Sequence, residues 1–297
     1  MSGRDGTWER IAAQVAASTR TPFSIARRSS LGGGCINDAC LIEGGGRRYF
    51  VKLNRADKVE MFAAEAEGLA EILATATIRV PAPVCHGANG GASWLVLEYL
   101  ELGGRGDPRE LGRRLAQMHR VTGHGFGWRR DNTIGSTPQP NTPCNDWIAF
   151  WREHRLGFQL RLAKRNGLRG ALQAKGERLL GRLEAFFRGY APAPSLLHGD
   201  LWGGNHGYTT GGQPVLFDPA VYYGDREADL AMTELFGGFP SAFYAAYNEA
   251  WPLDSGHAMR KQLYNLYHVL NHANLFGGGY AAQAETMMER LLAQAVS

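Results

Sequence analysis

The sequence predicts an α+β chain built as two lobes, a small β-rich lobe over residues 1–102 and a larger, mainly helical lobe over residues 103–297. Three observations support this prediction. A chain of 297 residues is long enough for about two domains. Short apolar runs between glycine clusters dominate the first hundred residues, whereas apolar residues at helical spacing dominate the rest. Glycines 103, 104 and 106, followed by Asp107-Pro108, form the clearest boundary between the two regions.

The N-terminal lobe is expected to contain a β-hairpin, then a helix, then a further strand. Strand-like runs at 23–27, 38–43 and 48–53 are separated by glycine triplets, which favour turns. The next segment, 59–74, is predicted to be an amphipathic helix because Phe62, Ala66, Leu69 and Leu73 recur at helical spacing. Two prolines end this pattern, and residues 93–100 (SWLVLEYL) are predicted to form a buried strand.

The C-terminal lobe is expected to be mostly helical. A helix is predicted to open near Arg109, and further apolar periodicities mark helices around 147–162, 179–187 and 263–270. Only two short strands are predicted among them, at 195–198 and 214–218.

Composition excludes several classes of function. The hydrophobic share of 44% and the charged share of 20% are typical of a globular protein. The net charge is only +4 and the basic residues are scattered, which disfavours a nucleic-acid partner. No apolar run is long enough for a membrane span, and acidic residues near the N-terminus disfavour a signal peptide, so a cytoplasmic location is expected. The four cysteines lack zinc-site spacing and are expected to be reduced.

The strongest functional motif is the segment HGDLWGGN, residues 198–205, which follows an apolar strand. Its spacing matches the catalytic loop H-R-D-L-x-x-x-N of kinases, with Gly199 in the place of the arginine. In that pattern Asp200 accepts the proton of the acceptor hydroxyl, and Asn205 holds Mg²⁺. Eighteen residues beyond Asp200, Asp218 ends the next strand, where the second metal carboxylate is expected. The alternative is that these residues cap turns, as Asp and Asn do.

Upstream residues supply the expected nucleotide half of such a site. The backbone of Gly33, Gly34, Cys35 and Ile36, between two strands, is placed to approach phosphates, although many glycine clusters are plain turns. Lys52 closes a strand in YFVK, which resembles the phosphate-pairing lysine of kinases.

Glu65 gives the more specific signal, because it lies beside the apolar stripe of its predicted helix. A carboxylate in that position needs a partner, and Lys52 is the expected one. Glu98 and Leu100 occupy the position where a kinase hinge offers backbone groups to adenine. The order of these signals along the chain matches that of a kinase.

Two readings from other classes use the same residues. His198, Asp200 and a later histidine such as His257 have the composition of a two-histidine, one-carboxylate iron site of an oxygenase. That reading leaves Lys52 and Asn205 without a function, and it conflicts with a helical second half. A kinase-like module without activity is the third reading, and the presence of every key residue disfavours it.

The motif and its continuation resemble the fructosamine kinase (ketosamine-3-kinase) family, a branch of the protein-kinase-like fold related to aminoglycoside phosphotransferases. The resemblance covers about residues 20–292, and it is carried by HGDLWGGN, FDPAVYYG at 217–224, ExDLAM at 227–232, ELFGGF at 234–239 and LNHxNxFG at 270–277. The stretch from Phe126 to Trp147 resembles the acceptor side of the family. Asp225-Arg226 departs from the family pattern, and no long activation segment follows Asp218.

The resemblance implies phosphorylation by MgATP of the 3-hydroxyl of a ketosamine, a ribulosamine, erythrulosamine or fructosamine carried by a small amine or a protein lysine. It implies substrate contacts for Trp202, His272 and Asn274, with a core role as the alternative for Trp202 and His272. It also makes Cys35 a candidate redox switch, with an unreactive small side chain as the alternative, so that a monomer or a redox-dependent homodimer is expected. The alternative acceptor is another small hydroxyl compound, an aminoglycoside or choline.

Overall fold

The computed structural model describes residues 2–32 and 36–295, and these form two compact units. The first unit contains residues up to Gly106 together with Gly207–Pro219, and the second contains Asp107–His206 and Ala220–Ser297. Within the described residues, none of the helices combines the length and apolar character needed for a transmembrane span.

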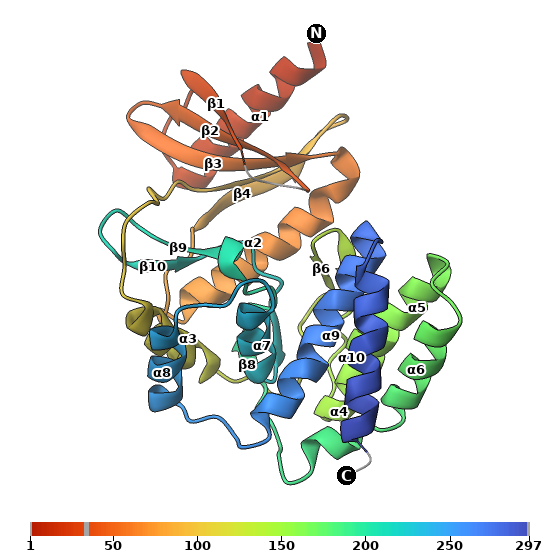
Figure 1. Ribbon diagram of the computed structural model, residues 1–297. Coiled ribbons are helices and arrows are strands. Elements are labelled where there is room, and N and C mark those ends of the chain that lie inside the picture. Colours follow the sequence, from red (N-terminus) through yellow and green to blue (C-terminus); the bar gives the residue numbers. More distant parts are fainter. Residues whose placement is uncertain (1, 33–35, 296–297) are drawn as a thin grey trace. The chain divides into compact units, whose positions relative to one another are not determined.

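The first unit is built on a five-stranded antiparallel sheet with the order β1-β2-β3-β5-β4 (Figure 1). Its strands are β1 (Arg27–Leu31), β2 (Asp38–Gly44), β3 (Arg47–Asn54), β4 (Pro83–Ala88) and β5 (Ser93–Glu98). The hairpin between β2 and β3 and the strand β5 confirm the sequence prediction. The first strand lies later than expected, at 27–31 rather than 23–27, and β4 was not predicted.

Helices cover both faces of this sheet. The helix α1 (Ser2–Thr19), which the sequence analysis missed, places Ile11 and Val15 in a core cluster with Val51 of β3 and with Trp94 and Val96 of β5. Because side chains alternate along a strand, Lys52 points to the opposite face, toward α2. The helix α2 (Val59–Ala74) has the predicted bounds and carries Glu65 on that face.

A small hairpin completes the first unit. It consists of β9 (His206–Tyr208) and β10 (Pro214–Leu216), and the sequence analysis had assigned this segment to the second lobe. The amide of Leu216 donates to the carbonyl of Arg79, and the amide of Gly103 donates to that of Tyr208. A Cβ on Gly104 would lie 1.8 Å from a hairpin carbonyl oxygen, so the glycine cluster at the expected boundary is also a packing site for the hairpin.

The second unit is mainly helical. Its helices are α3 (Pro108–His119), α4 (Trp147–Phe150), α5 (Gly157–Arg165), α6 (Ala171–Leu180), α7 (Glu227–Leu235), α8 (Ser241–Ala250), α9 (His257–Phe276) and α10 (Tyr280–Gln294). The predicted helix at 179–187 is instead the end of α6 and a 3-10 turn at Leu183–Phe187, with Gly181 between them. The helix α9 packs against α5, α7 and α10.

The helix predicted at 147–162 is present as three consecutive parts: α4, a π-helical segment at Trp151–Leu156, and α5. Two short strand pairs complete the unit: β6 (Asn132–Ile134) with β7 (Thr137–Gln139), and β8 (Ser195–Leu197) with β11 (Tyr222–Gly224). The strand β8 was predicted, whereas β6, β7 and β11 have only three residues each and were missed. The strand β8 leads directly into HGDLWGGN.

Candidate active site

The catalytic-loop segment turns sharply after β8, and Gly199 makes this turn possible. Its φ of +84° is in the left-handed region, where glycine is favoured. A Cβ at this position would lie 2.1 Å from the carbonyl oxygen of Ala220. The amide of Ala220 in turn donates to the carbonyl of His198. The arginine that kinases carry here therefore does not fit this chain's backbone.

Asp229, on α7, holds the backbone of this loop. Its Oδ2 accepts from the amide of His198 at 2.7 Å, and its Oδ1 accepts from the amide of Gly199 at 2.8 Å. Its carboxylate also lies 3.1 Å from Nε2 of His119, whose Nδ1 lies 2.8 Å from the hydroxyl of Tyr247. Asp229 is 1% exposed and His119 is fully buried.

The charges in this network are determined by burial and bonding together. Burial lowers the pKa of His119, so the imidazole is neutral and donates from Nε2 to the carboxylate while Nδ1 accepts from Tyr247. Burial opposes ionisation of Asp229, but the bond from His119 and the amide of Gly199 help to outweigh it and lower the pKa of that carboxyl. Asp229 was predicted only as part of the motif ExDLAM, and its role was not predicted. A carboxylate between apolar helix residues was the available signal.

Asn205 fixes the candidate base. Its Nδ2 donates to the backbone carbonyl of Asp200 at 2.8 Å and reaches Oδ2 of the same residue at 3.3 Å. The amide group of Asn205 is thereby oriented, with its nitrogen toward Asp200 and its oxygen as the acceptor end. The structure brings together the two residues that the motif singled out within the second unit.

In the first unit, Lys52 lies between two carboxylates. Its Nζ is 2.6 Å from Oε1 of Glu65 and 2.6 Å from Oδ1 of Asp218. The side chain of Lys52 is 7% exposed, that of Glu65 is 12% exposed, and that of Asp218 is 50% exposed. Burial opposes the charge of Lys52, but the carboxylates of Asp218 and Glu65 outweigh it and raise the lysine pKa above its ordinary range. The predicted pairing of Lys52 with Glu65 is confirmed.

Asp218 reaches Lys52 through an unusual backbone conformation. Its φ is +57°, a left-handed value that Asp tolerates better than most residues. The residue follows β10 and belongs to the first unit, whereas Asn205 belongs to the second. The half-exposed carboxylate has one oxygen engaged by Lys52.

Asn205 in the second unit carries an amide oxygen and Asp218 in the first carries a carboxylate oxygen. Both are donor types that Mg²⁺ prefers, and the role of each residue as a metal ligand stays a prediction. Across the part of the chain that the structure describes, no three His, Cys, Asp or Glu side chains are arranged to hold a metal. The iron-site reading of His198, Asp200 and His257 is therefore wrong.

Of the segment predicted to approach the nucleotide phosphates, only Ile36 lies within the described residues. Gly33, Gly34 and Cys35 lie outside the described residues. Ile36 is 39% exposed, and its carbonyl accepts from Nδ2 of Asn54 on β3.

Glu98 and Leu100 are the residues predicted to form a hinge that contacts adenine. The side chain of Glu98 pairs with Arg79, and its amide donates to the carbonyl of Ala82. Adenine contacts of Glu98 and Leu100 stay predictions.

The residues predicted to contact substrate differ in their surroundings. Trp202 is 40% exposed, so the alternative core role is wrong for it. His272 is half-buried, donates from Nδ1 to the carbonyl of His268 and packs on aromatic rings. Asn274 uses both ends of its amide within the protein: Nδ2 donates to Gln159, and Oδ1 accepts from Asn166. Its contacts tie α9 to α5, and its substrate role stays a prediction.

The acceptor-side stretch is anchored to the segment that leads into β11. Gln139, fully buried on β7, donates from Nε2 to the carbonyl of Ala220, and Asn132 donates to that of Val221. Arg155 of the π-helical segment is also fully buried, and it donates to Pro140 and Asn141. This stretch is therefore fixed in place by buried polar groups rather than forming a plain surface loop.

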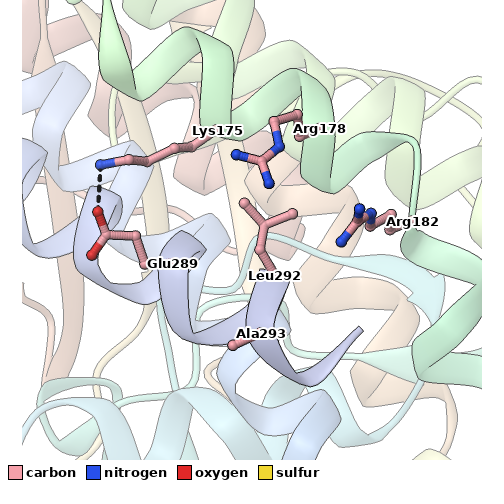
Figure 2. A pocket seen from close by; sticks show the side chains of 6 residues that line it. All are labelled: Lys175, Arg178, Arg182, Glu289, Leu292 and Ala293. Atoms are coloured by element: carbon pink, nitrogen blue, oxygen red, sulfur yellow. Dashed lines mark ion pairs between the residues drawn. The ribbon is translucent and has the colours of Figure 1, made fainter. Parts of the chain in front are cut away.

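A basic groove elsewhere in the second unit lacks comparable chemistry. Figure 2 shows Lys175, Arg178 and Arg182 above Leu292, where α6 approaches α10. Lys175 pairs with Glu289 at 2.7 Å and also with Glu285. The arginines lie in and just after the last turn of α6, where the helix dipole disfavours an anion. Glu289, the carboxylate among the lining residues, is engaged by Lys175.

The fold and these residues define a phosphotransferase of the protein-kinase-like fold. The structure of the aminoglycoside phosphotransferase APH(4)-Ia matches with a TM-score of 0.60 over 95% of this chain and 98% of its own, and at 15% identity it shows the shared fold. The fructosamine kinase family model matches residues 7–294. The chain belongs to the fructosamine kinase family, as its motifs predicted.

Individual relatives agree with this assignment. The chain is 51% identical over 293 residues to a probable ketoamine kinase of Synechocystis, covering 96% of this chain and 97% of the relative. It is 45% identical to the chloroplastic protein-ribulosamine 3-kinase of Arabidopsis thaliana, covering 90% and 83% respectively. A crystal structure assigned to a fructosamine-3-kinase from Haemophilus somnus matches with a TM-score of 0.88 and 30% identity, covering 96% and 97%.

Proposed function

We propose that this protein is a ketosamine 3-kinase that transfers the γ-phosphoryl group of ATP to the 3-hydroxyl of a sugar joined to an amine. The observation that carries the phosphoryl-transfer chemistry is Lys52, held at 2.6 Å by both Glu65 and Asp218. Two relatives at 51% and 45% identity are named for ketoamine and protein-ribulosamine phosphorylation, and these names support the substrate class. Complexes of the fold relatives with AMP-PNP and ADP support ATP as the donor.

Each residue has a defined task in this proposal. Lys52 binds the nucleotide phosphates, and Glu65 keeps its ammonium group in place. Asn205 and Asp218 are the residues that would hold Mg²⁺, and the metal would supply neutralisation of the phosphate charge. Asp200 accepts the proton of the 3-hydroxyl as that oxygen attacks phosphorus, and ADP leaves.

The product supports a role in repair. A ketosamine 3-phosphate is unstable and falls apart, which frees the amine. An amine-bound sugar on a protein lysine would thereby be removed. ATP as the donor fits the cytoplasmic location that the sequence predicts. Aminoglycosides are the weaker candidates as acceptors, because the aminoglycoside phosphotransferases resemble this chain at 12–16% identity and share only its fold.

The test is ADP release with MgATP and synthetic ribulosyl-lysine or fructosyl-lysine, run beside kanamycin and choline. Turnover confined to the ketosamines is expected, and the ratio between the two sugars identifies the preferred one. Asp200→Asn is expected to lower kcat by a factor of about 10²–10⁴, the usual contribution of a general base. Asp107→Asn is the matched control, because Asp107 caps α3 and asparagine caps helices equally well. Turnover of kanamycin or choline alone would refute the substrate class.

A further inference from the structure

A continuous aromatic surface begins beside the candidate base. It consists of Trp202, Phe236, His272, Phe276 and Tyr280. The ring centroids of Trp202 and Phe236 are 6.5 Å apart, and those of Phe236 and His272 are 4.9 Å apart. His272 lies 5.5 Å from Phe276 and 5.2 Å from Tyr280. All five residues belong to the second unit.

The exposure of these rings is unusual for this chain. Trp202 is 40% exposed, Phe236 37% and Phe276 60%. Only two other large apolar side chains among the described residues are exposed, Ile36 and Leu102, and both belong to the first unit. Every such side chain described in the second unit therefore lies in one surface, and apolar surface gathered in this way is typical of an interaction site.

Glycines border each exposed ring. Gly203 follows Trp202, Gly237 and Gly238 follow Phe236, and a run of three glycines, 277–279, follows Phe276. A Cβ at any of these six positions would meet nothing within 4 Å. The space over the backbone at these six glycines is therefore open, so another polypeptide has room to approach there.

We infer that this aromatic surface binds the polypeptide on either side of a ketosamine-bearing lysine. The inference rests on the proposed function. Trp202 lies two residues beyond Asp200 in the same loop, so the surface begins next to the candidate base in the sequence. The steps from Phe236 to His272 and on to Phe276 together span at most the length of about three residues of extended chain. The exposed rings of Trp202, Phe236 and Phe276 are apolar, so they favour apolar residues beside the modified lysine.

The test compares three acceptors: free ribulosyl-lysine, a peptide with ribulosyl-lysine between leucines, and the same peptide with glycines in place of the leucines. For the wild type, kcat/KM is expected to be about tenfold higher for the leucine peptide than for the glycine peptide, with the difference in KM. Phe276→Ala is expected to bring this ratio to about one, whereas Phe276→Leu retains most of it. Arg178→Ala, an exposed change in α6, is expected to leave the ratio at its wild-type value.

The outcomes separate this inference from the proposed function. Turnover of free ribulosyl-lysine with equal kcat/KM for both peptides would overturn the inference and leave the proposed function intact. A dimer seen by sedimentation that is lost in Phe276→Ala, without a peptide preference, would assign the surface to a second copy and also overturn it. Absence of turnover on every ketosamine would refute both.

Discussion

Replacing Asp229 with asparagine tests how the catalytic loop is held. The carboxylate accepts two backbone N–H groups, at 2.7 Å from His198 and 2.8 Å from Gly199. An asparagine amide has one oxygen, so one of these N–H groups would face an NH₂ group instead. A hydrogen bond to a charged group contributes about 1.5–3 kcal/mol, and a buried donor left without a partner costs a similar amount. Because Asp229 is 1% exposed, solvent does not screen this loss, which we expect to be about 2–4 kcal/mol.

In Asp229→Asn, the lost hydrogen bonding to the loop should lower kcat rather than nucleotide affinity. If the transition state needs the loop held as it is, 2–4 kcal/mol corresponds to a fall in kcat of about 30- to 1,000-fold. The free energy of unfolding should fall by the same amount. Binding of the nucleotide should change less than about threefold, since a tenfold change needs about 1.4 kcal/mol and Lys52 is held by other carboxylates. Urea unfolding, steady-state kinetics and calorimetric titration with MgATP give the three quantities.

Asp225→Asn is the matched control for this substitution. Asp225 is also fully buried, but its carboxylate accepts from Tyr190, Tyr264 and the amide of Glu227, not from the loop. It is expected to keep kcat within about threefold of wild type, well under the 1.4 kcal/mol of a tenfold change. Two results would refute the reasoning: a wild-type kcat in Asp229→Asn, or an equal loss of kcat in Asp225→Asn.

Two further substitutions test the charges. Lys52→Met removes the cation and leaves Glu65 buried without it. Nucleotide binding should therefore weaken at least tenfold, and the free energy of unfolding should fall by about 3 kcal/mol. Unchanged nucleotide titration and thermal unfolding would contradict this prediction. Burial lowers the pKa of His268 to about 3, so the folded protein keeps this ring neutral. Its contribution to stability is present above the unfolded pKa of about 6.5 and is lost at about 1.4 kcal/mol per pH unit as the pH falls toward the folded value. Urea unfolding from pH 7.5 to 5 should show a shallower loss in His268→Gln, and parallel curves would disprove the assignment.

Sequence reasoning succeeded where the signal was local. The bounds of α2 follow from apolar spacing within sixteen residues, and the same spacing placed Glu65 beside the apolar stripe. The need of a carboxylate at that position for a cation then identified Lys52, thirteen residues away. The helix α1 carried a comparable signal, since Trp8, Ile11 and Val15 lie on one helical face, and it could have been predicted.

Contacts between segments far apart in the sequence could not be predicted from local residue spacing. Asp218 meets Lys52 across 166 residues, through a hairpin of two three-residue strands that have too little sequence for a periodicity. The role of Asp229 depends on loop amides 30 and 31 residues earlier, and amides carry no residue identity. The substitution of glycine for arginine in the catalytic motif was visible, but its cause, the carbonyl of Ala220, was not.

In each unit, the candidate site residues are held in place by bonds to other residues of the same unit. In the first unit, Lys52 is oriented by two carboxylates. In the second, the charge of Asp229 is taken up by two amides and a neutral His119, and Asn205 orients Asp200. Dipoles and charges fixed during folding need no reorganisation at the moment of reaction, which is the main source of electrostatic catalysis. Because the same bonds stabilise the fold and position the reacting groups, substitutions at Asp229 should lower stability and kcat together, whereas exposed rings such as Phe276 should alter substrate choice with little effect on stability.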